Sequence, residues 1–116
     1  VLIWNRIAMK YKLRYINKVI YLVEYQPDGI TSLISQVRMN SPVATTITYA
    51  EMLKFDVPFA AKVKSAINYY RFKACISKLG KVKHPIPHIG TAWCVCKPLG
   101  WLMHRKDLKL LADKSD

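Results

Sequence analysis

The chain has 116 residues, of which 52% are hydrophobic, and a formal net charge of +12. This length and apolar content predict one folded domain, and they exclude a disordered basic tail. The longest apolar stretch, residues 1–25, is interrupted by five Lys or Arg residues, whereas a membrane-spanning helix needs roughly 18 uncharged apolar residues. The sequence therefore predicts no membrane segment.

One long part of the chain contains no acidic residue. The fifty residues from Val57 to Lys106 include neither Asp nor Glu. The same stretch carries ten cations, namely Lys62, Lys64, Arg71, Lys73, Lys78, Lys81, Lys83, Lys97, Arg105 and Lys106. Because like charges at this density repel one another in a folded chain, the pattern predicts a surface that meets a polyanion. Nucleic acid is the polyanion we expect.

The cysteine content indicates the compartment. Three cysteines (Cys75, Cys94 and Cys96) are an odd number without a regular spacing, which is not typical of a disulfide framework. We therefore expect a reducing compartment and a cytoplasmic or nucleoid-associated protein.

Residues 1–28 form an N-terminal extension that ends at the turn signal Gln26-Pro27-Asp28-Gly29. Residues 19–23 have the composition of a strand. Four apolar residues of the same region instead have the spacing of a helix: Leu13, Ile16, Ile20 and Val23. A helix is favoured for the first part of the region, and helix and strand both stay open for the second.

Residues 29–112 make up the predicted domain, which begins with alternating helical and extended segments. A helix is expected over 30–40 and ends before Pro42. Residues 43–48, β-branched at five of six positions, favour an extended segment. A short helix over 49–55 follows, with Thr48 and Glu51 as its capping box.

After a break at 56–58, a longer helix is expected over 59–79, and Gly80 ends it. Its apolar stripe is Ala60, Val63, Ile67, Tyr70 and Ala74, with Ile76 as a further candidate.

The pattern changes after Gly80. Residues 81–86 and 92–97 have the composition of two strands, with turn residues between them, and together they predict a hairpin. A last helix is expected over 99–111, followed by a frayed tail at 113–116.

This order of helix, extended segment, short helix, turn, longer helix and hairpin resembles the winged helix-turn-helix domain over residues 30–97. The resemblance implies an α+β fold in which the helix over 59–79 lies in the DNA major groove and the hairpin forms the wing. Carried onto this chain, the DNA-binding residues are Lys62, Lys64, Ser65, Asn68, Tyr69, Arg71 and Lys73 on the helix, and Lys81, Lys83 and Lys97 on the wing. Lys and Arg suit phosphates and guanine, and Asn suits adenine.

A second likeness concerns short motifs. Thr48-Tyr49-Ala50-Glu51, then Pro58-Phe59-Ala60-Ala61-Lys62-Val63, and His84-Pro85-Ile86-Pro87 are similar to motifs of the alkylguanine alkyltransferases and alkyltransferase-like proteins. The reactive Pro-Cys-His-Arg motif of that family is absent, because Val95 follows Cys94 and Lys97 follows Cys96. The likeness therefore implies DNA binding without alkyl transfer.

The sequence also bears on metal binding and catalysis. His84, His88, Cys94 and Cys96 are all able to bind zinc, but their spacing matches no usual zinc motif. Cys94 and Cys96 on one face of a strand are more often small core residues. No catalytic residues, metal or cofactor are therefore predicted.

The sequence thus predicts a non-catalytic DNA-binding protein, a small transcriptional regulator, which prefers duplex DNA to RNA. The alternatives are a basic RNA-binding subunit of a ribonucleoprotein and an adaptor for an acidic protein. The C-terminal helix offers a seam for a homodimer through Leu99, Leu102, Leu108 and Leu111.

Overall fold

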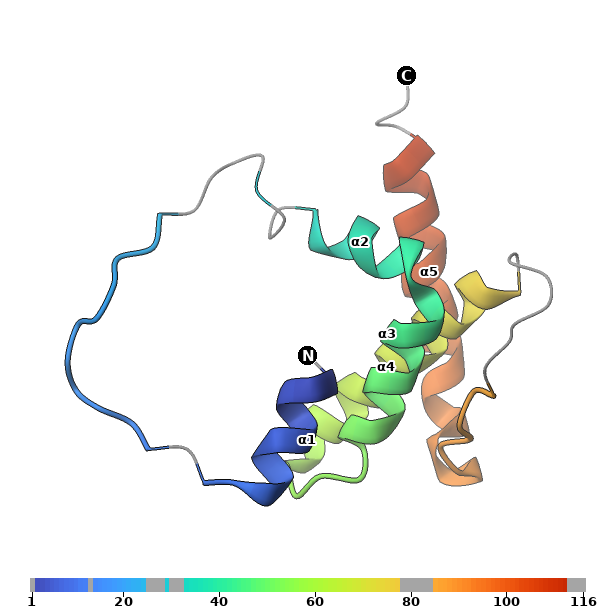
Figure 1. Cartoon of the computed structure of the whole chain (residues 1–116). Helices are drawn as coiled ribbons and strands as arrows, with labels where there is room; N and C mark the ends of the chain where they lie inside the picture. The colour runs from blue at the N-terminus through green and yellow to red at the C-terminus, as the bar shows by residue number, and fades with distance from the viewer. Residues whose placement is uncertain (1, 13, 25–28, 30–32, 78–84, 113–116) are drawn as a thin grey trace.

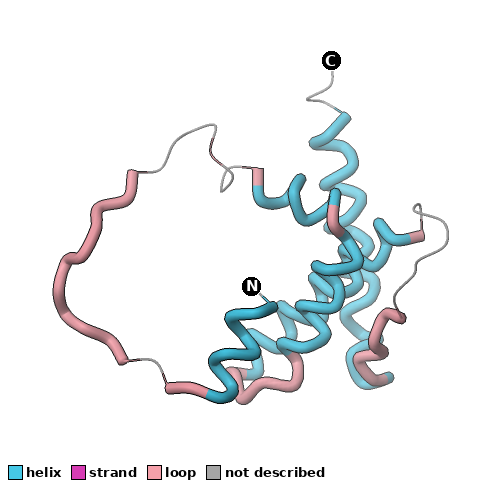
Figure 2. Tube along the Cα trace, viewed as in Figure 1, coloured by secondary structure: helices cyan, strands magenta, loops and turns pink. Residues whose placement is uncertain are grey.

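The computed structural model describes residues 2–12, 14–24, 29, 33–77 and 85–112 (Figure 1). Within these residues there are helices and no strand (Figure 2). The elements are α1 (Leu2–Lys10), α2 (Ile34–Asn40), α3 (Pro42–Met52), α4 (Phe59–Ile76), the 3-10 helix η1 (Thr91–Cys96) and α5 (Lys97–Ala112). The expected α+β winged-helix fold is therefore wrong. None of the helices in this part of the chain is long and apolar enough to cross a membrane.

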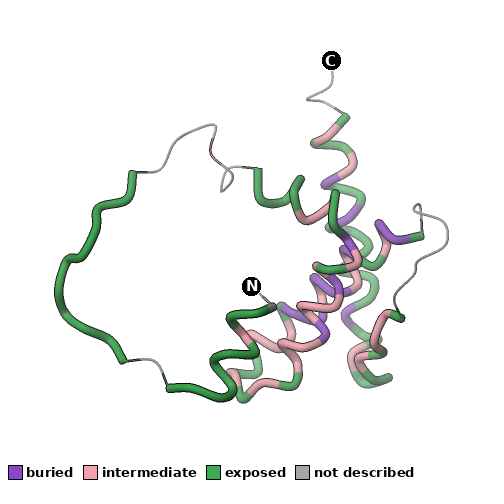
Figure 3. The backbone as a smooth tube through the Cα atoms, in the orientation of Figure 1, coloured by how far each residue is buried: buried purple, intermediate pink, exposed green. Residues whose placement is uncertain are grey.

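Helix α4 is the centre of the fold, because it packs against both α3 and α5 (Figure 1). Ala66, Tyr69 and Phe72 on α4 are at most 1% exposed. Tyr49 of α3 stacks on Phe72 with the ring centroids 5.9 Å apart. Figure 3 shows buried positions along α3, α4 and α5. The expected helix over 59–79 is confirmed as α4, and its predicted end at Gly80 lies outside the described residues.

Residues 43–48 are helical, so the extended segment predicted for them is wrong. Pro42 begins α3, where its fixed φ suits the first turn and its missing N–H costs nothing. The hydroxyls of Thr45 and Thr48 donate to the carbonyls of Ser41 and Ala44 one turn earlier, at 2.9 and 2.8 Å. Contact with α4 outweighs the weak strand preference of this segment, since Thr46 is fully buried there.

Glu51 lies in the last turn of α3 and not at a helix start. The predicted capping box is wrong, because Thr48 and Glu51 lie inside α3. Glu51 instead accepts a 2.6 Å hydrogen bond from Arg6, which ties α1 to α3. The expected break at 56–58 is confirmed, since these residues separate α3 from α4.

The predicted hairpin is also absent from the described residues. Residues 81–84, the larger part of the first expected strand, lie outside them, and residues 85–90 are irregular. Residues 91–96 form η1, which continues directly into α5 at Lys97. Gly90 precedes η1 with a φ of +89°, a conformation that favours glycine, and Pro98 lies in the first turn of α5. The last helix expected over 99–111 is confirmed as part of α5.

Helices α4 and α5 cross at Gly100. A Cβ atom on Gly100 would lie 2.7 Å from the carbonyl oxygen of Ile67 and 2.9 Å from the amide nitrogen of Arg71. Only glycine lets the two backbones approach this closely. This crossing fixes which side chains of α4 and α5 lie next to one another.

The residues between α1 and α2 leave the helical body. Those described, 11–12 and 14–24, are neither helix nor strand. The helix favoured for the first part of this region is therefore wrong, and the second part, for which helix and strand were both open, forms neither. They follow an extended path away from the helices (Figure 1) and are exposed throughout (Figure 3). We call residues 14–24 the arm. Of the expected helix over 30–40, residues 34–40 are confirmed as α2, and residues 30–32 lie outside the described part.

Candidate nucleic-acid interface

Four of the residues predicted to read DNA lie in the interior of the helical body. Ser65, Asn68 and Tyr69 are 2%, 8% and 1% exposed. The Ser65 hydroxyl donates to Ala61 of its own helix, and the Asn68 amide donates to Lys64. The Tyr69 hydroxyl donates to the carbonyl of Pro87 at 2.8 Å. These polar groups already have partners within the protein.

Arg71 is the fourth of these residues. Its Nε and Nη2 atoms each donate a 2.6 Å hydrogen bond to the carboxylate of Asp107 on α5. The two side chains are only 15% and 10% exposed. Arg71 therefore joins α4 to α5, and its charge is compensated within the protein.

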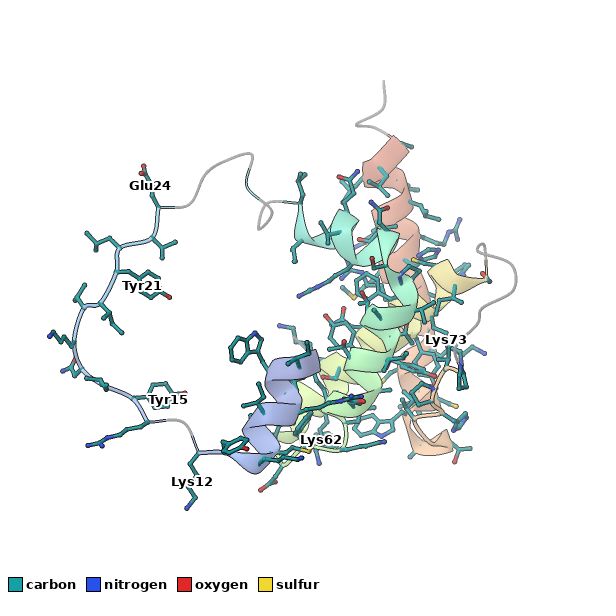
Figure 4. The ribbon with its side chains drawn as sticks, viewed as in Figure 1. Lys12, Tyr15, Tyr21, Glu24, Lys62 and Lys73 are labelled. Carbon is teal, nitrogen blue, oxygen red and sulfur yellow. The ribbon has the colours of Figure 1, made fainter. Side chains whose placement is uncertain are left out.

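The remaining predicted cations do not form one surface. Lys62 and Lys73 share a face of α4 but are about 16 Å apart along the helix, and Lys64 points roughly the other way. Figure 4 shows Lys62 and Lys73 far apart on the body. Lys81 and Lys83 lie outside the described residues, and Lys97 is the first residue of α5, not part of a strand. These placements leave Lys73 and Lys97 as predicted cations that lie near each other.

Lys73 and Lys97 both line a groove of about 650 Å³ between α4, η1 and α5. Tyr70, Ala74, Pro98 and Trp101 supply carbon surface to it, and His88 and Cys94 complete the lining. Trp101 is 53% exposed, so an aromatic ring in this wall is accessible from solvent. We call these eight residues the aromatic groove.

A third cation lies at the edge of the aromatic groove. The guanidinium of Arg105 lies 4.8 Å from the ring centroid of Trp101, a cation–π contact. Lys97, Trp101 and Arg105 follow one another at intervals of four residues on one face of α5. Lys73 approaches from α4, where its ammonium group lies 3.3 Å from the Tyr69 hydroxyl.

The inner wall of the groove is held by Tyr70. Its hydroxyl donates to the sulfur of Cys94 at 3.5 Å, and its ring packs edge-on against Tyr69 with centroids 5.2 Å apart. Burial, helped by the bond to Cys94, raises the pKa of Tyr70 to about 12. Tyr70 therefore stays neutral across the physiological range and adds no negative charge to the groove.

The Asp and Glu residues in the described part of the chain do not neutralise the positive charges at the aromatic groove. There are four of them, Glu24, Glu51, Asp56 and Asp107. Glu51 and Asp107 are paired with Arg6 and Arg71. None of the four lines the aromatic groove.

Among the described residues, the candidate zinc ligands are not grouped as a metal site. Cys94 is exposed and Cys96 is buried, so the expectation that they share one face is wrong. His88 accepts a hydrogen bond from the amide of Gly90. In the part of the chain that the structure describes, no three His, Cys, Asp or Glu residues are grouped to hold a metal ion, and His84 lies outside that part.

The predicted dimer seam stays a prediction. Leu99 and Leu102 are exposed, whereas Leu108 and Leu111 are half-buried, and Leu111 lines a cavity with Leu33.

The sequence pattern places Tyr70 in the apolar stripe of the helix over 59–79 and does not predict the aromatic groove. The four-residue spacing of Lys97, Trp101 and Arg105 is the signal that predicts their shared face.

Comparison with protein-family models, curated proteins and solved structures finds no match to this chain.

Proposed function

We propose that this protein is a non-catalytic nucleic-acid-binding protein, and that unpaired bases bind in the aromatic groove. The observation that carries the proposal is the half-exposed ring of Trp101, flanked by Lys97 and Arg105 on α5 with Lys73 opposite on α4. Aromatic rings stack on bases and cations pair with phosphates, which is how proteins hold single strands.

A recognition helix in the major groove is not part of this proposal, because α4 is packed between α3 and α5. In a duplex the faces of the bases are stacked on one another and cannot reach Trp101. An unpaired strand of DNA or RNA presents both a free base face and a phosphate. We therefore expect single strands to bind more tightly than duplex DNA, the reverse of the preference predicted from the sequence.

The binding experiment compares three labelled ligands by fluorescence anisotropy: a single-stranded RNA, the same sequence as single-stranded DNA, and a DNA duplex. If Lys73, Lys97 and Arg105 contact phosphates, the logarithm of the association constant for the single strand should fall linearly with the logarithm of the salt concentration. The expected slope is roughly −2. A slope near zero, or a preference for the duplex, would contradict the proposal.

A matched pair of double variants locates the interface. Replacing Lys73 and Lys97 by Glu should weaken single-strand binding by more than about tenfold, because both cations line the groove. Replacing Lys54 and Lys109 by Glu changes the net charge equally, but these exposed lysines do not line it. Equal losses in the two variants would mean that only net charge matters. Displacement of the strand by a polyglutamate peptide would favour an acidic protein as the partner.

Trp101→Ala separates stacking from charge. Stacking on one aromatic ring is worth about 1–3 kcal/mol per base, so this variant should bind single strands roughly 5- to 160-fold more weakly at unchanged net charge. Its salt slope should stay the same, since no cation is lost. An unchanged affinity would place the bound bases elsewhere.

A further inference from the structure

The arm leaves large apolar side chains without any cover. Ile16, Val19, Ile20, Tyr21, Leu22 and Val23 are between 65% and 93% exposed. Figure 4 shows Tyr15, Tyr21 and Glu24 along this segment, clear of the helices. An extended segment with β-branched and aromatic side chains is suited to pair with another strand. The described residues contain no strand that would serve as its partner.

The order of charges in the arm is complementary to that of a second copy of the arm running antiparallel to it. Residues 19–23 carry no charge, and a cation, Lys18, precedes them while an anion, Glu24, follows them. When two copies of such a segment run antiparallel with Tyr21 opposite Tyr21, Lys18 of each copy lies opposite Glu24 of the other. Opposite charges at directly facing positions stabilise an antiparallel pair.

The apolar residues match in the same register. Val19 lies opposite Val23, Ile20 opposite Leu22, and the two Tyr21 rings meet on the twofold axis. A twofold axis of this kind gives a closed dimer, in which each copy uses the same surface. A parallel, in-register pairing would instead put Lys18 against Lys18 and Glu24 against Glu24.

We propose that residues 18–24 form an intermolecular antiparallel β-ribbon with a second copy of this chain, centred on Tyr21. This inference is independent of the proposed function, because it uses no residue of the aromatic groove. Two strands alone make a weak unit. The dimer should therefore form at high protein concentration and dissociate on dilution.

Sedimentation equilibrium of the full chain tests the charge pairing. Lys18→Glu puts a second carboxylate opposite Glu24 of the other copy, and Glu24→Lys puts a second ammonium group opposite Lys18. Each variant alone should therefore have a dimer dissociation constant raised roughly tenfold or more. In an equimolar mixture of the two variants, a heterodimer has unlike charges opposite each other at both ends of the ribbon. This heterodimer should therefore be more stable than the homodimer of either variant. The double variant Lys18→Glu/Glu24→Lys restores both ion pairs and should dimerise normally.

Several results would overturn the inference: a chain that stays monomeric at every concentration, single variants that dimerise as well as the original, or a double variant that fails to associate. The Lys18 and Glu24 variants should keep the helical fold, because the arm lies outside the helical core. A change in their dimer dissociation constant therefore reports pairing of the arms and not unfolding. Circular dichroism of each variant checks this, and the helical signal should be unchanged.

Disulfide trapping tests the register. In a Cys94→Ser background, Tyr21→Cys should cross-link under mild oxidation, because directly opposed strand residues lie within disulfide reach. Tyr15→Cys is the control: in this register the two introduced cysteines would be about 40 Å apart along the ribbon and should stay reduced. Equal cross-linking at both positions would indicate parallel stacking and would overturn the antiparallel register.

Discussion

Arg71 of α4 and Asp107 of α5 form a two-pronged ion pair, with both hydrogen bonds at 2.6 Å and both side chains largely removed from water. Asp107 is the first acid after the fifty-residue acid-free stretch. The positive charge of Arg71, which lies within that stretch, is therefore compensated by Asp107, the residue that directly follows the stretch. The charge available to a ligand is smaller than the sequence suggests, and it lies elsewhere on the surface.

Asp107→Asn should destabilise the fold by about 3 kcal/mol, the low end of what is lost when one partner of a buried ion pair is removed. That loss is large against the roughly 5–15 kcal/mol that is usual for the whole stability of a domain. Urea denaturation measures the loss, and a change below about 0.5 kcal/mol would mean that the pair is exposed in solution. The double variant Arg71→Met/Asp107→Leu is the control. It should recover most of the stability, because neither charge is then left buried alone.

The same pair affects the design of binding experiments. Arg71→Glu would place two carboxylates together between α4 and α5 and unfold this contact. A loss of nucleic-acid binding in that variant would report instability. Lys73 and Lys97 are the informative positions, because both are exposed.

Gly100→Ala should destabilise the crossing of α4 and α5. An alanine normally favours a helix over glycine by about 1 kcal/mol. Here the added Cβ would lie 2.7 Å from the Ile67 carbonyl oxygen, and backbone cannot move aside as a side chain can. We expect a net loss of about 1–3 kcal/mol by thermal or urea denaturation. Gly90→Ala is a useful comparison: its added Cβ meets no atom within 4 Å, so any loss there comes from the positive φ alone. A stabilised Gly100→Ala variant would contradict the close crossing.

The helices α4 and α5 were predictable from the sequence because strong local signals bound them. Pro58 precedes α4, and α5 begins two residues before the expected range of 99–111 and ends one residue beyond it. The face of α4 that lies in the core was not predictable in this way. A single apolar stripe assumes one buried face, whereas α4 is covered on two sides and buries Ser65 and Asn68 as well. These polar side chains are tolerated because each donates to a carbonyl of its own helix.

Two of the errors in secondary structure have a common cause. Residues 43–48 and 92–97 have strand-like composition, and in both segments contacts with α4 favour a helical conformation. Local propensity contains no information about such contacts. The aromatic groove was missed for the same reason, since it is formed by residues from three elements that are distant in sequence.

The pair between Arg6 and Glu51 predicts an acid-sensitive contact between α1 and α3. The hydrogen bond from Arg6 lowers the pKa of Glu51 below its ordinary value of 4.5. A lowered folded-state pKa contributes stability above the unfolded pKa, and that contribution is lost as the pH falls through the lowered value. Docking of α1 should therefore weaken only in the acid range below 4.5. The Glu51 carboxyl resonance followed by NMR gives the pKa directly, and Arg6→Gln should return it toward 4.5. A wild-type pKa at or above 4.5 would contradict the ion pair.

At high pH the sensitive group is Tyr70, whose pKa is raised to about 12 by burial and by its hydrogen bond to Cys94. A raised folded-state pKa stabilises the fold fully below the unfolded value of 10, and this contribution is lost as the pH rises from 10 toward 12. Ultraviolet titration should therefore show a late phenol step near pH 12. Tyr70→Phe should remove that late step. If Tyr70→Phe removed an early step instead, the inner wall of the aromatic groove would be open to water, and Tyr70 would be available to stack on a base beside Trp101.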